Sequence, residues 1–298
     1  MIYGLQQVLN GAPVAAFYAA LAFGYSLAFS LTKRADITFG ALVACAGHLF
    51  LLVAHIGWNR LVLTFPAALG FGALVALLAV PAAGIALGGR VIAPLALRSP
   101  NAVMVAALGI MLVLMEAARL LSGTRELWLP PFLNSPAFIV SDGSVRMSLT
   151  MLQVINTLVL LLLIAVVALF LRRSAFGRNW QAVSQDPLAA RLCGIDPAAI
   201  HAGAYGLAAV FAALCGLLAT AHYGTMDFGA GLVFGLKTVL IAAVGGHHHP
   251  LRAAGGAALV GFAEALWSAY LPLAWRDAAV FGALIVLLVL RRRVPDDL

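Results

Sequence analysis

Apolar runs of about 20 residues recur along the whole chain, and each is long enough to cross a hydrocarbon core of about 30 Å as a helix. Hydrophobic residues make up 63% of the 298 positions, whereas charged residues make up only 10%. A water-soluble domain with this ratio would expose an apolar, aggregating surface. We therefore predict a protein whose solvent is the lipid bilayer. The N-terminal residues lack a basic segment and a small-residue cleavage site, so we expect no cleaved signal peptide.

The runs predict an all-α, polytopic transmembrane bundle with eight or nine membrane-spanning segments, formed by a single domain over residues 1–298. They are rich in Leu, Ala, Val and Gly and lack the two-residue alternation of a membrane barrel, so helices are expected. The predicted spans are 12–32, 41–56, 61–81, 102–121, 151–171, 202–222, 233–249, 253–271 and 277–290. The second, seventh and last are short, and one of them can instead be re-entrant or interfacial.

Basic residues predict the orientation of the bundle. If the polar loop 172–201 is cytoplasmic, 12 of the 18 basic residues fall inside, four fall in outer loops such as 122–150, and two lie within spans. This asymmetry obeys the positive-inside rule. It places the N-terminus outside and the C-terminus in the cytoplasm if all nine segments cross. The net charge of +7 is then a topology signal, and no nucleic-acid partner is expected.

Small residues recur at four-residue spacing within several spans. Ala204, Ala208, Ala212 and Gly216 would line one face of the sixth span. Shorter sets of the same kind occur in the first span (Ala20, Gly24, Ala28) and in the eighth (Ala257, Gly261). Helices in lipid associate through such faces because small side chains let the backbones approach. We expect helix contacts there, either within the bundle or with a second subunit.

Two Asp-Pro pairs organise the loop 172–201. Asp186 followed by Pro187 is typical of an N-cap and first helical position, so a short helix from Leu188 to Cys193 is expected. Gly194 is placed to end it in the left-handed conformation, and a second Asp-Pro pair then opens the next span. Leu188, Leu192 and Ile195 would give this segment an apolar side, and Arg178 and Arg191 a basic side. It is either an amphipathic connector lying on headgroups or a contact for a cytoplasmic motor.

The segment GRNWQAVSQDPLAARLCGIDPAAI (177–200) resembles the cytoplasmic coupling loop of the branched-chain amino acid ABC-transporter permeases. Three further blocks resemble the same family in the same order: YAALAFGYSLAFSLTKRADITFGAL (18–42), GLKTVLIAAVGG (235–246) and AAGGAALVGFAEALWSAYL (253–271). The sequence departs from the family at residues 37–40, which replace an Asn-Phe-Ala-His-Gly turn, and at His247–His249, which replace Ile-Gly-Ser.

The resemblance implies a multi-pass permease subunit of a bacterial inner-membrane importer. Its partners would be cytoplasmic ABC ATPase subunits, a second permease subunit and an extracytoplasmic solute-binding protein, within membrane lipid. The substrate would be a branched-chain or other hydrophobic amino acid, or by the wider family urea or a short amide. The ATPase-coupling residues would be those of the loop: Arg178, Asp186, Pro187, Leu188, Arg191, Leu192, Gly194 and Ile195.

Ionisable residues at membrane depth are costly and predict functional positions. Glu116 and Arg119 are three residues apart on one helix and can pair with each other. Glu264 lies within its span without a partner nearby in sequence, and Lys237 could extend its long stem to the surface. Asp36, beside Lys33 and Arg34, is expected to be a solvated charge at a helix end. The candidates for lining a translocation path are Thr38, Glu116, Lys237 and Glu264.

No motif for chemistry occurs. The segment GLVFGLKT (231–238) comes nearest to a phosphate-binding loop, but its lysine is out of register with the glycine. We therefore expect no enzyme activity, catalytic residue, cofactor or ATPase within this chain. Three adjacent histidines, His247–His249, point in different directions and cannot close a metal site alone, so no metal is predicted. The three cysteines form no CxxC pair, and no disulfide is expected.

Two other functions remain open on the sequence. A stand-alone secondary transporter or channel for a small polar solute would need repeat symmetry, broken helices and midplane carboxylates, of which only Glu264 is a fair candidate. A membrane enzyme would have to use the histidines and Glu264 without any recognisable motif.

Overall fold

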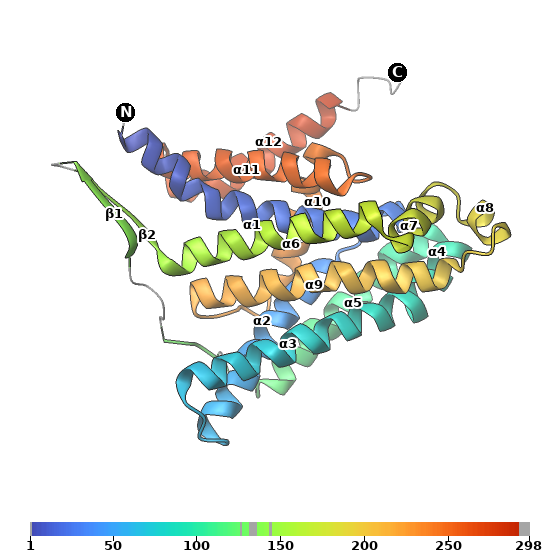
Figure 1. Cartoon of the computed structure of the whole chain (residues 1–298), viewed down its shortest axis with the longest axis horizontal. Helices are drawn as coiled ribbons and strands as arrows, with labels where there is room; N and C mark the ends of the chain where they lie inside the picture. The colour runs from blue at the N-terminus through green and yellow to red at the C-terminus, as the bar shows by residue number, and fades with distance from the viewer. Residues whose placement is uncertain (1, 126, 131–135, 143–144, 292–298) are drawn as a thin grey trace.

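The structure is a computed structural model that describes residues 2–125, 127–130, 136–142 and 145–291. It is a bundle of helices with one hairpin of strands at an end (Figure 1). The helices are α1 (Ile2–Thr32), α2 (Thr38–Asn59), α3 (Phe65–Leu87), α4 (Ala93–Arg98), α5 (Pro100–Leu121), α6 (Met151–Arg173), α7 (Ala175–Gln185), α8 (Pro187–Leu192), α9 (Pro197–Tyr223), α10 (Ala230–Gly245), α11 (Pro250–Tyr270) and α12 (Arg276–Arg291). A π-helical turn (Gly88–Ile92) joins α3 to α4, and a 3₁₀ turn (Leu273–Trp275) precedes α12.

The predicted helical membrane fold is confirmed, but eight or nine spans is too many. Within the described residues, six helices are long and apolar enough to cross a membrane, or seven if α10 and α11 together form one bent span. These two helices meet at an angle of 108°, so the segments predicted at 233–249 and 253–271 are a broken pair. Both α10 and α12 have 16 residues and rise about 24 Å at 1.5 Å per residue, which is less than the hydrocarbon core.

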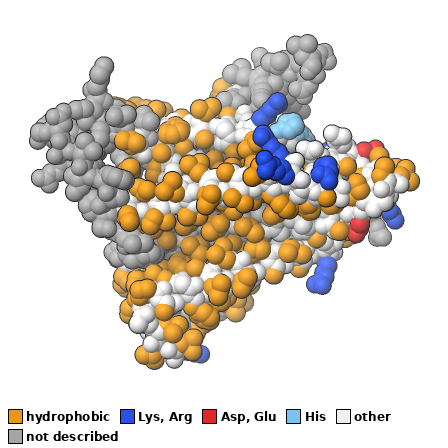
Figure 2. All heavy atoms as spheres, viewed as in Figure 1, with side chains coloured by type: hydrophobic (Ala, Val, Ile, Leu, Met, Phe, Trp, Pro, Cys, Tyr) orange, Lys and Arg blue, Asp and Glu red, His pale blue; other side chains and the backbone are white. Residues whose placement is uncertain are grey.

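Helices α1, α2 and α9 form the centre of the bundle. The most apolar window of α1 is 83% buried and that of α9 is 67% buried, whereas that of α6 is only 17% buried. Large aromatic side chains from two of the central helices fill this core, as where the rings of Phe23 and Phe211 lie 5.0 Å apart. The outer helices expose leucines and valines, and orange apolar side chains cover much of the lateral surface in Figure 2. This surface suits contact with lipid chains.

Glycines bring the central helices into backbone contact. A Cβ atom on Gly40 of α2 would lie 2.1 Å from the backbone nitrogen of Gly235 in α10. A Cβ on Gly216 of α9 would lie 2.1 Å from the Val43 carbonyl oxygen of α2. The small-residue faces predicted from sequence are buried, and Gly24 packs on the Phe211 side chain. Packing of this closeness is how helices associate in lipid.

The two ends of the bundle differ in what they carry. At one end the antiparallel strands β1 (Pro136–Asp142) and β2 (Val145–Thr150) form a hairpin within the predicted outer loop 122–150. Thr150 then opens α6 with a capping box that it completes with Gln153. At the other end α7 and α8 lie beyond the long helices, and α8 is at the tip (Figure 1). We refer to these as the hairpin end and the α8 end.

Residues 33–37, the α1–α2 connection, turn back into the bundle. Lys33 stops α1 with a φ of 51°, and Ile37 lies against Gly235 near the middle of α10. Asp36 is only 2% exposed, so the expectation of a solvated charge is wrong. Lys33 and Arg34 are exposed, whereas Asp36 is buried because it contacts Tyr205 of α9, beside Ile37 on α10.

Candidate functional site

A cavity of about 550 Å³ lies in the half of the bundle nearer the hairpin end. Helices α1, α6, α9, α10 and α11 and the start of α12 supply its walls. Apolar side chains such as Val14, Phe17, Leu160 and Phe234 make up part of the lining. Polar and charged side chains make up the rest, which distinguishes this cavity from the apolar core around it. We call it the charged cavity.

Glu264 is the centre of the charged side of this cavity and is 6% exposed. Tyr18 donates its hydroxyl proton to Oε2 at 2.5 Å, and Lys237 Nζ lies 3.0 Å from the carboxylate. Arg276 Nε lies 3.6 Å from Oε1, and the ammonium of Lys237 also sits 4.9 Å from the centre of the Tyr18 ring. Opposite charges and a hydroxyl thus surround a carboxylate that would otherwise be too costly at this depth.

The cluster is nearly neutral as a whole because Asp277 adds a second carboxylate. Its Oδ1 is 3.2 Å from Arg276 Nε and 4.0 Å from Lys237 Nζ. Partial burial lowers the pKa of the Arg276 guanidinium, but the hydrogen bond and charge of Asp277, together with the charge of Glu264, outweigh it and raise that pKa. Arg276 is therefore a permanent cation at the rim of the cavity.

Asn156 of α6 also lines the charged cavity. Its Oδ1 atom is buried and makes no hydrogen bond within the described residues. An unpaired buried acceptor costs free energy, of order 1–3 kcal/mol, unless a water or ligand donates to it. The cavity therefore offers a vacant acceptor together with cations and a carboxylate, which suits a small solute that carries both donors and acceptors.

Two of the four predicted path residues meet in this cavity and two do not. Lys237 and Glu264 pair directly, so the expected extension of the Lys237 stem to the surface is wrong. Glu116 pairs instead with Arg119 at 2.6 Å on the surface of α5. Thr38 is fully buried at the start of α2 and does not line the charged cavity.

The segment at the α8 end has the local structure that its sequence predicts. Asp186 caps α8, because its Oδ1 accepts from the amides of Leu188 and Ala189 at 2.8 and 3.1 Å. Gly194 follows with a φ of +83°, and Asp196 caps α9 through the Ala198 amide. The caps fix the backbone of α8 while Leu188 and Leu192 remain 69% and 84% exposed. Arg178 and Arg191 are exposed as well, whereas Ile195 is half-buried against the core.

Helix α7 was not expected from the sequence. Its inner face is formed by Gly177, Trp180 and Val183, which recur at helical spacing. Trp180 donates its indole N–H to the Leu27 carbonyl oxygen of α1 at 3.2 Å. The Ser174 hydroxyl caps this helix by accepting from the Gly177 amide. The α7–α8 segment is therefore packed on α1, α6 and α9 through its inner face, while Leu188 and Leu192 of α8 stay exposed.

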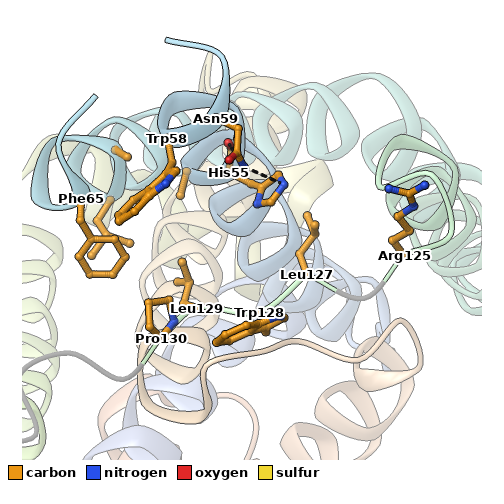
Figure 3. Close-up of a pocket in the computed structure, with 12 residues that line it drawn as sticks. His55, Trp58, Asn59, Phe65, Arg125, Leu127, Trp128, Leu129 and Pro130 are labelled. Atoms are coloured by element: carbon orange, nitrogen blue, oxygen red, sulfur yellow. Dashed lines mark hydrogen bonds between the residues drawn. The ribbon is translucent and has the colours of Figure 1, made fainter. Parts of the chain in front are cut away.

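A second cavity, of about 370 Å³, lies near the hairpin end between α2, α3, Arg125 and residues 127–130 (Figure 3). Trp58, Phe65 and Trp128 provide aromatic walls, and the Trp58 and Phe65 rings meet edge-on at 5.0 Å. His55 and Asn59 bond to each other across one turn of α2. Tryptophan is enriched at the membrane–water interface, and this cavity shares no residue with the charged cavity.

The three histidines lie in the turn between α10 and α11, and His249 precedes the first residue of α11. The His247 ring packs 4.3 Å from the centre of the Phe29 ring. Among the described residues, no group of three His, Cys, Asp or Glu side chains could hold a metal ion.

Nearly the whole chain resembles one group of membrane transport proteins. Residues 7–289 match the family model described as branched-chain amino acid transport system / permease component. The chain belongs to this family. This permease-family chain is 27% identical over 297 residues to the high-affinity branched-chain amino acid transport system permease protein LivH of Escherichia coli K12, an alignment that covers 97% of the chain and 94% of LivH.

Two further relatives give the same result. LivH of Salmonella typhimurium is 26% identical to this permease-family chain over 289 residues, with 97% and 94% of the two chains covered. The permease protein BraD of Pseudomonas aeruginosa is 27% identical over 292 residues, with 96% and 94% covered. None of the solved structures matches significantly.

Several important residues of this permease carry no signal in its sequence. Tyr18, Asn156 and Arg276 reach the charged cavity from three different helices, and nothing local to them indicates a common site. For α7, by contrast, the spacing of Phe176, Trp180 and Val183 was a usable signal of an amphipathic helix.

Proposed function

We propose that this chain is the membrane-spanning permease subunit of an ATP-driven importer. In this proposal a cytoplasmic ATPase binds α8 and drives the subunit through that contact. The observation that carries the proposal is the pair Leu188 and Leu192, two large apolar side chains held out from the tip of the molecule on a capped helix. A protruding apolar surface of this kind marks a protein contact. The coupling residues are those expected from the sequence: Arg178, Asp186, Pro187, Leu188, Arg191, Leu192, Gly194 and Ile195.

The proposal places the α8 end in the cytoplasm and the hairpin end outside, with the N-terminus outside. The distribution of basic residues supports this orientation, because on the face shown in Figure 2 most Lys and Arg side chains gather toward the α8 end. Two permease subunits, two ATPases and an extracytoplasmic binding protein would form the working complex in the inner membrane. Its cargo would be a branched-chain or other hydrophobic amino acid, in keeping with LivH and BraD, which are permease proteins of branched-chain amino acid transport systems.

In this proposal the charged cavity is part of the translocation path. Lys237 and Arg276 can attract a carboxylate, and Glu264 and Asn156 Oδ1 can accept from an ammonium group. Phe17 and Phe234 offer apolar surface to a hydrocarbon side chain. Closure of the ATPases would move α8 and shift the helix bundle from one conformation to another. A contact at the α8 end could in this way change the access of solute to the charged cavity.

The test is to replace Leu188 with Asp and to purify the subunit together with its ATPase. Because Leu188 is 69% exposed, the bundle should fold as before, while ATPase retention and ATP-driven uptake should fall at least about tenfold, the loss expected at a contact hot spot. The matched control is Val62→Asp, since Val62 is 84% exposed near the hairpin end. Unchanged retention and uptake in Leu188→Asp would refute the coupling role of α8.

A second function is favoured by one observation, namely the buried carboxylate Glu264 beside the bent helix pair α10–α11. Both features occur in secondary transporters and in channels. Vesicles that contain only this subunit distinguish the two functions. An importer subunit should carry no solute without its ATPase, whereas solute flux through the subunit alone would establish the second function.

A further inference from the structure

The α1–α2 connection (residues 33–37) contacts the α7–α8 segment. Lys33 Nζ donates to the Gln185 carbonyl oxygen, at the end of α7, over 3.5 Å. Two turns earlier in α1, the Leu27 carbonyl oxygen accepts the indole proton of Trp180. Trp180 is only 6% exposed, so this side of α7 is packed against the end of α1.

Within the bundle, Asp36 fastens the same connection to α9. Its Oδ2 accepts the hydroxyl proton of Tyr205 at 2.5 Å, and its Oδ1 accepts from the Thr38 amide at 2.9 Å. Asp36 is 2% exposed and Tyr205 is 3% exposed. No ion pair to Asp36 occurs in the part of the chain that the structure describes. The Tyr205 hydroxyl is therefore the main side-chain partner of a deeply buried carboxylate.

On its other side the connection meets the helix that carries Lys237. A Cβ on Gly235 of α10 would lie 2.5 Å from Cγ2 of Ile37, so Ile37 packs directly on the backbone of α10 at a position where only glycine fits. Lys237 follows two residues later and pairs with Glu264 in the charged cavity. A continuous series of contacts thus runs from Gln185 and Trp180, through the α1–α2 connection, to the cavity.

We propose that Asp36 is a positioning residue for transport: by holding the α1–α2 connection on Tyr205, it makes a displacement of α7–α8 reach α10 and the charged cavity. The inference rests on the proposed function, in which the ATPase moves α8. It adds the α1–α2 connection to the direct contacts that α7 and α8 make with α6 and α9, the helices that flank them in sequence. Two distant sites can be energetically coupled when the packed side chains and hydrogen bonds between them can adopt two discrete conformations.

Tyr205→Phe tests the proposal because it removes one hydroxyl and keeps the ring. The matched control is Thr220→Val, since Thr220 is also fully buried on α9 and its hydroxyl donates to the Gly216 carbonyl oxygen of the same helix rather than to the α1–α2 connection. Both variants are purified as the full complex with ATPase and binding protein and are placed in vesicles with ATP and labelled leucine. Assembly, ATP hydrolysis and uptake are all measured, and the readout is solute taken up per ATP hydrolysed.

Tyr205→Phe should assemble and hydrolyse ATP but lower the uptake per ATP by about fivefold or more, the usual size of coupling between sites. Thr220→Val should leave this ratio unchanged. An unchanged ratio in Tyr205→Phe, or an equal fall in both variants, would overturn the proposal. If Tyr205→Phe does not assemble, Asp36→Asn decides in the same way, because the amide keeps the size and one acceptor.

The wild-type complex separates this inference from the proposed function. If the wild-type subunit retains no ATPase, or if its uptake does not depend on ATP, the proposed function fails before any variant is compared. If the wild type couples uptake to hydrolysis and the Tyr205→Phe ratio is normal, only the role of Asp36 fails.

Discussion

Two ion pairs on the helices of this permease have opposite surroundings. Glu116 and Arg119 lie 2.6 Å apart on the surface of α5, with side chains 52% and 49% exposed. Lys237 and Glu264 lie 3.0 Å apart between α10 and α11, with side chains 14% and 8% exposed. The exposed pair is the shorter one, and it joins residues three apart on the same helix. The buried pair joins two helices and has further partners from α1 and α12.

The comparison teaches that surroundings, not distance, decide what an ion pair contributes. Glu116 and Arg119 lie in the last two turns of α5 and can exchange each other for water or lipid headgroups. Glu264 and Lys237 are largely shielded from solvent, so removal of either leaves the other with only its longer ion pair, that of Lys237 to Asp277 at 4.0 Å or that of Glu264 to Arg276 at 3.6 Å. In the sequence, both pairs are ionisable residues within apolar helices, and both were therefore predicted to be functional. Only the fold shows that one pair is exposed and the other is buried.

Removal of the buried carboxylate should have the largest effect. Glu264→Leu leaves Lys237 with only the more distant carboxylate of Asp277, at 4.0 Å, and the Tyr18 hydroxyl without its acceptor, so the free energy of unfolding should fall by about 3–5 kcal/mol. Unfolding in mixed detergent micelles, followed by tryptophan fluorescence, measures this change. Glu264→Gln is the control, because it keeps an acceptor for Tyr18 and should lose less. Equal stability of Glu264→Leu and the wild type would show that the cluster does not hold α1, α10 and α11 together.

Removal of both charges should have an intermediate effect. The double variant Glu264→Leu with Lys237→Leu buries no unpaired Lys237 ammonium, so it should be more stable than Glu264→Leu alone, by about 1–2 kcal/mol. The same unfolding measurement checks the order of the two variants. If the loss of stability in the double variant equals the sum of the losses in Glu264→Leu and Lys237→Leu, the two residues contribute independently and are not energetically coupled.

The exposed pair should give the smallest effect. Glu116→Gln should leave both the unfolding midpoint and the uptake rate of the complex within experimental error, since Arg119 remains solvated. Thermal unfolding and vesicle uptake are the measurements, with Glu264→Gln as the sensitive comparison. A clear loss of uptake in Glu116→Gln would contradict this expectation and would support the original prediction that Glu116 lines the translocation path.

Local features of this fold could be predicted from the sequence because their causes are local. The caps Asp186 and Asp196 and the left-handed Gly194 were found where Asp-Pro pairs and a glycine indicated them. The long apolar runs likewise gave the helical membrane fold and most of its spans. The family followed from blocks of sequence in a fixed order, and the match over residues 7–289 confirms it.

The candidate site could be predicted only in part because its contacts join distant residues. Glu264 was recognised as unusual, but its bond to Tyr18 spans 246 residues of sequence. Asp36 was assigned to water because Lys33 and Arg34 precede it, whereas the chain turns inward immediately after them. The number of spans was too high because hydrophobicity measures the length of a run and not the 108° bend between α10 and α11.

That bend has a consequence for biosynthesis. With 16 residues, α10 is too short to span the hydrocarbon core of the bilayer by itself. At the bend, a Cβ on Gly245 would lie 1.8 Å from the Arg252 carbonyl oxygen, so the end of α10 and the start of α11 pack backbone against backbone. We therefore expect the two helices to enter the bilayer as one unit, because a chain truncated before Arg252 would lack the backbone on which α10 ends.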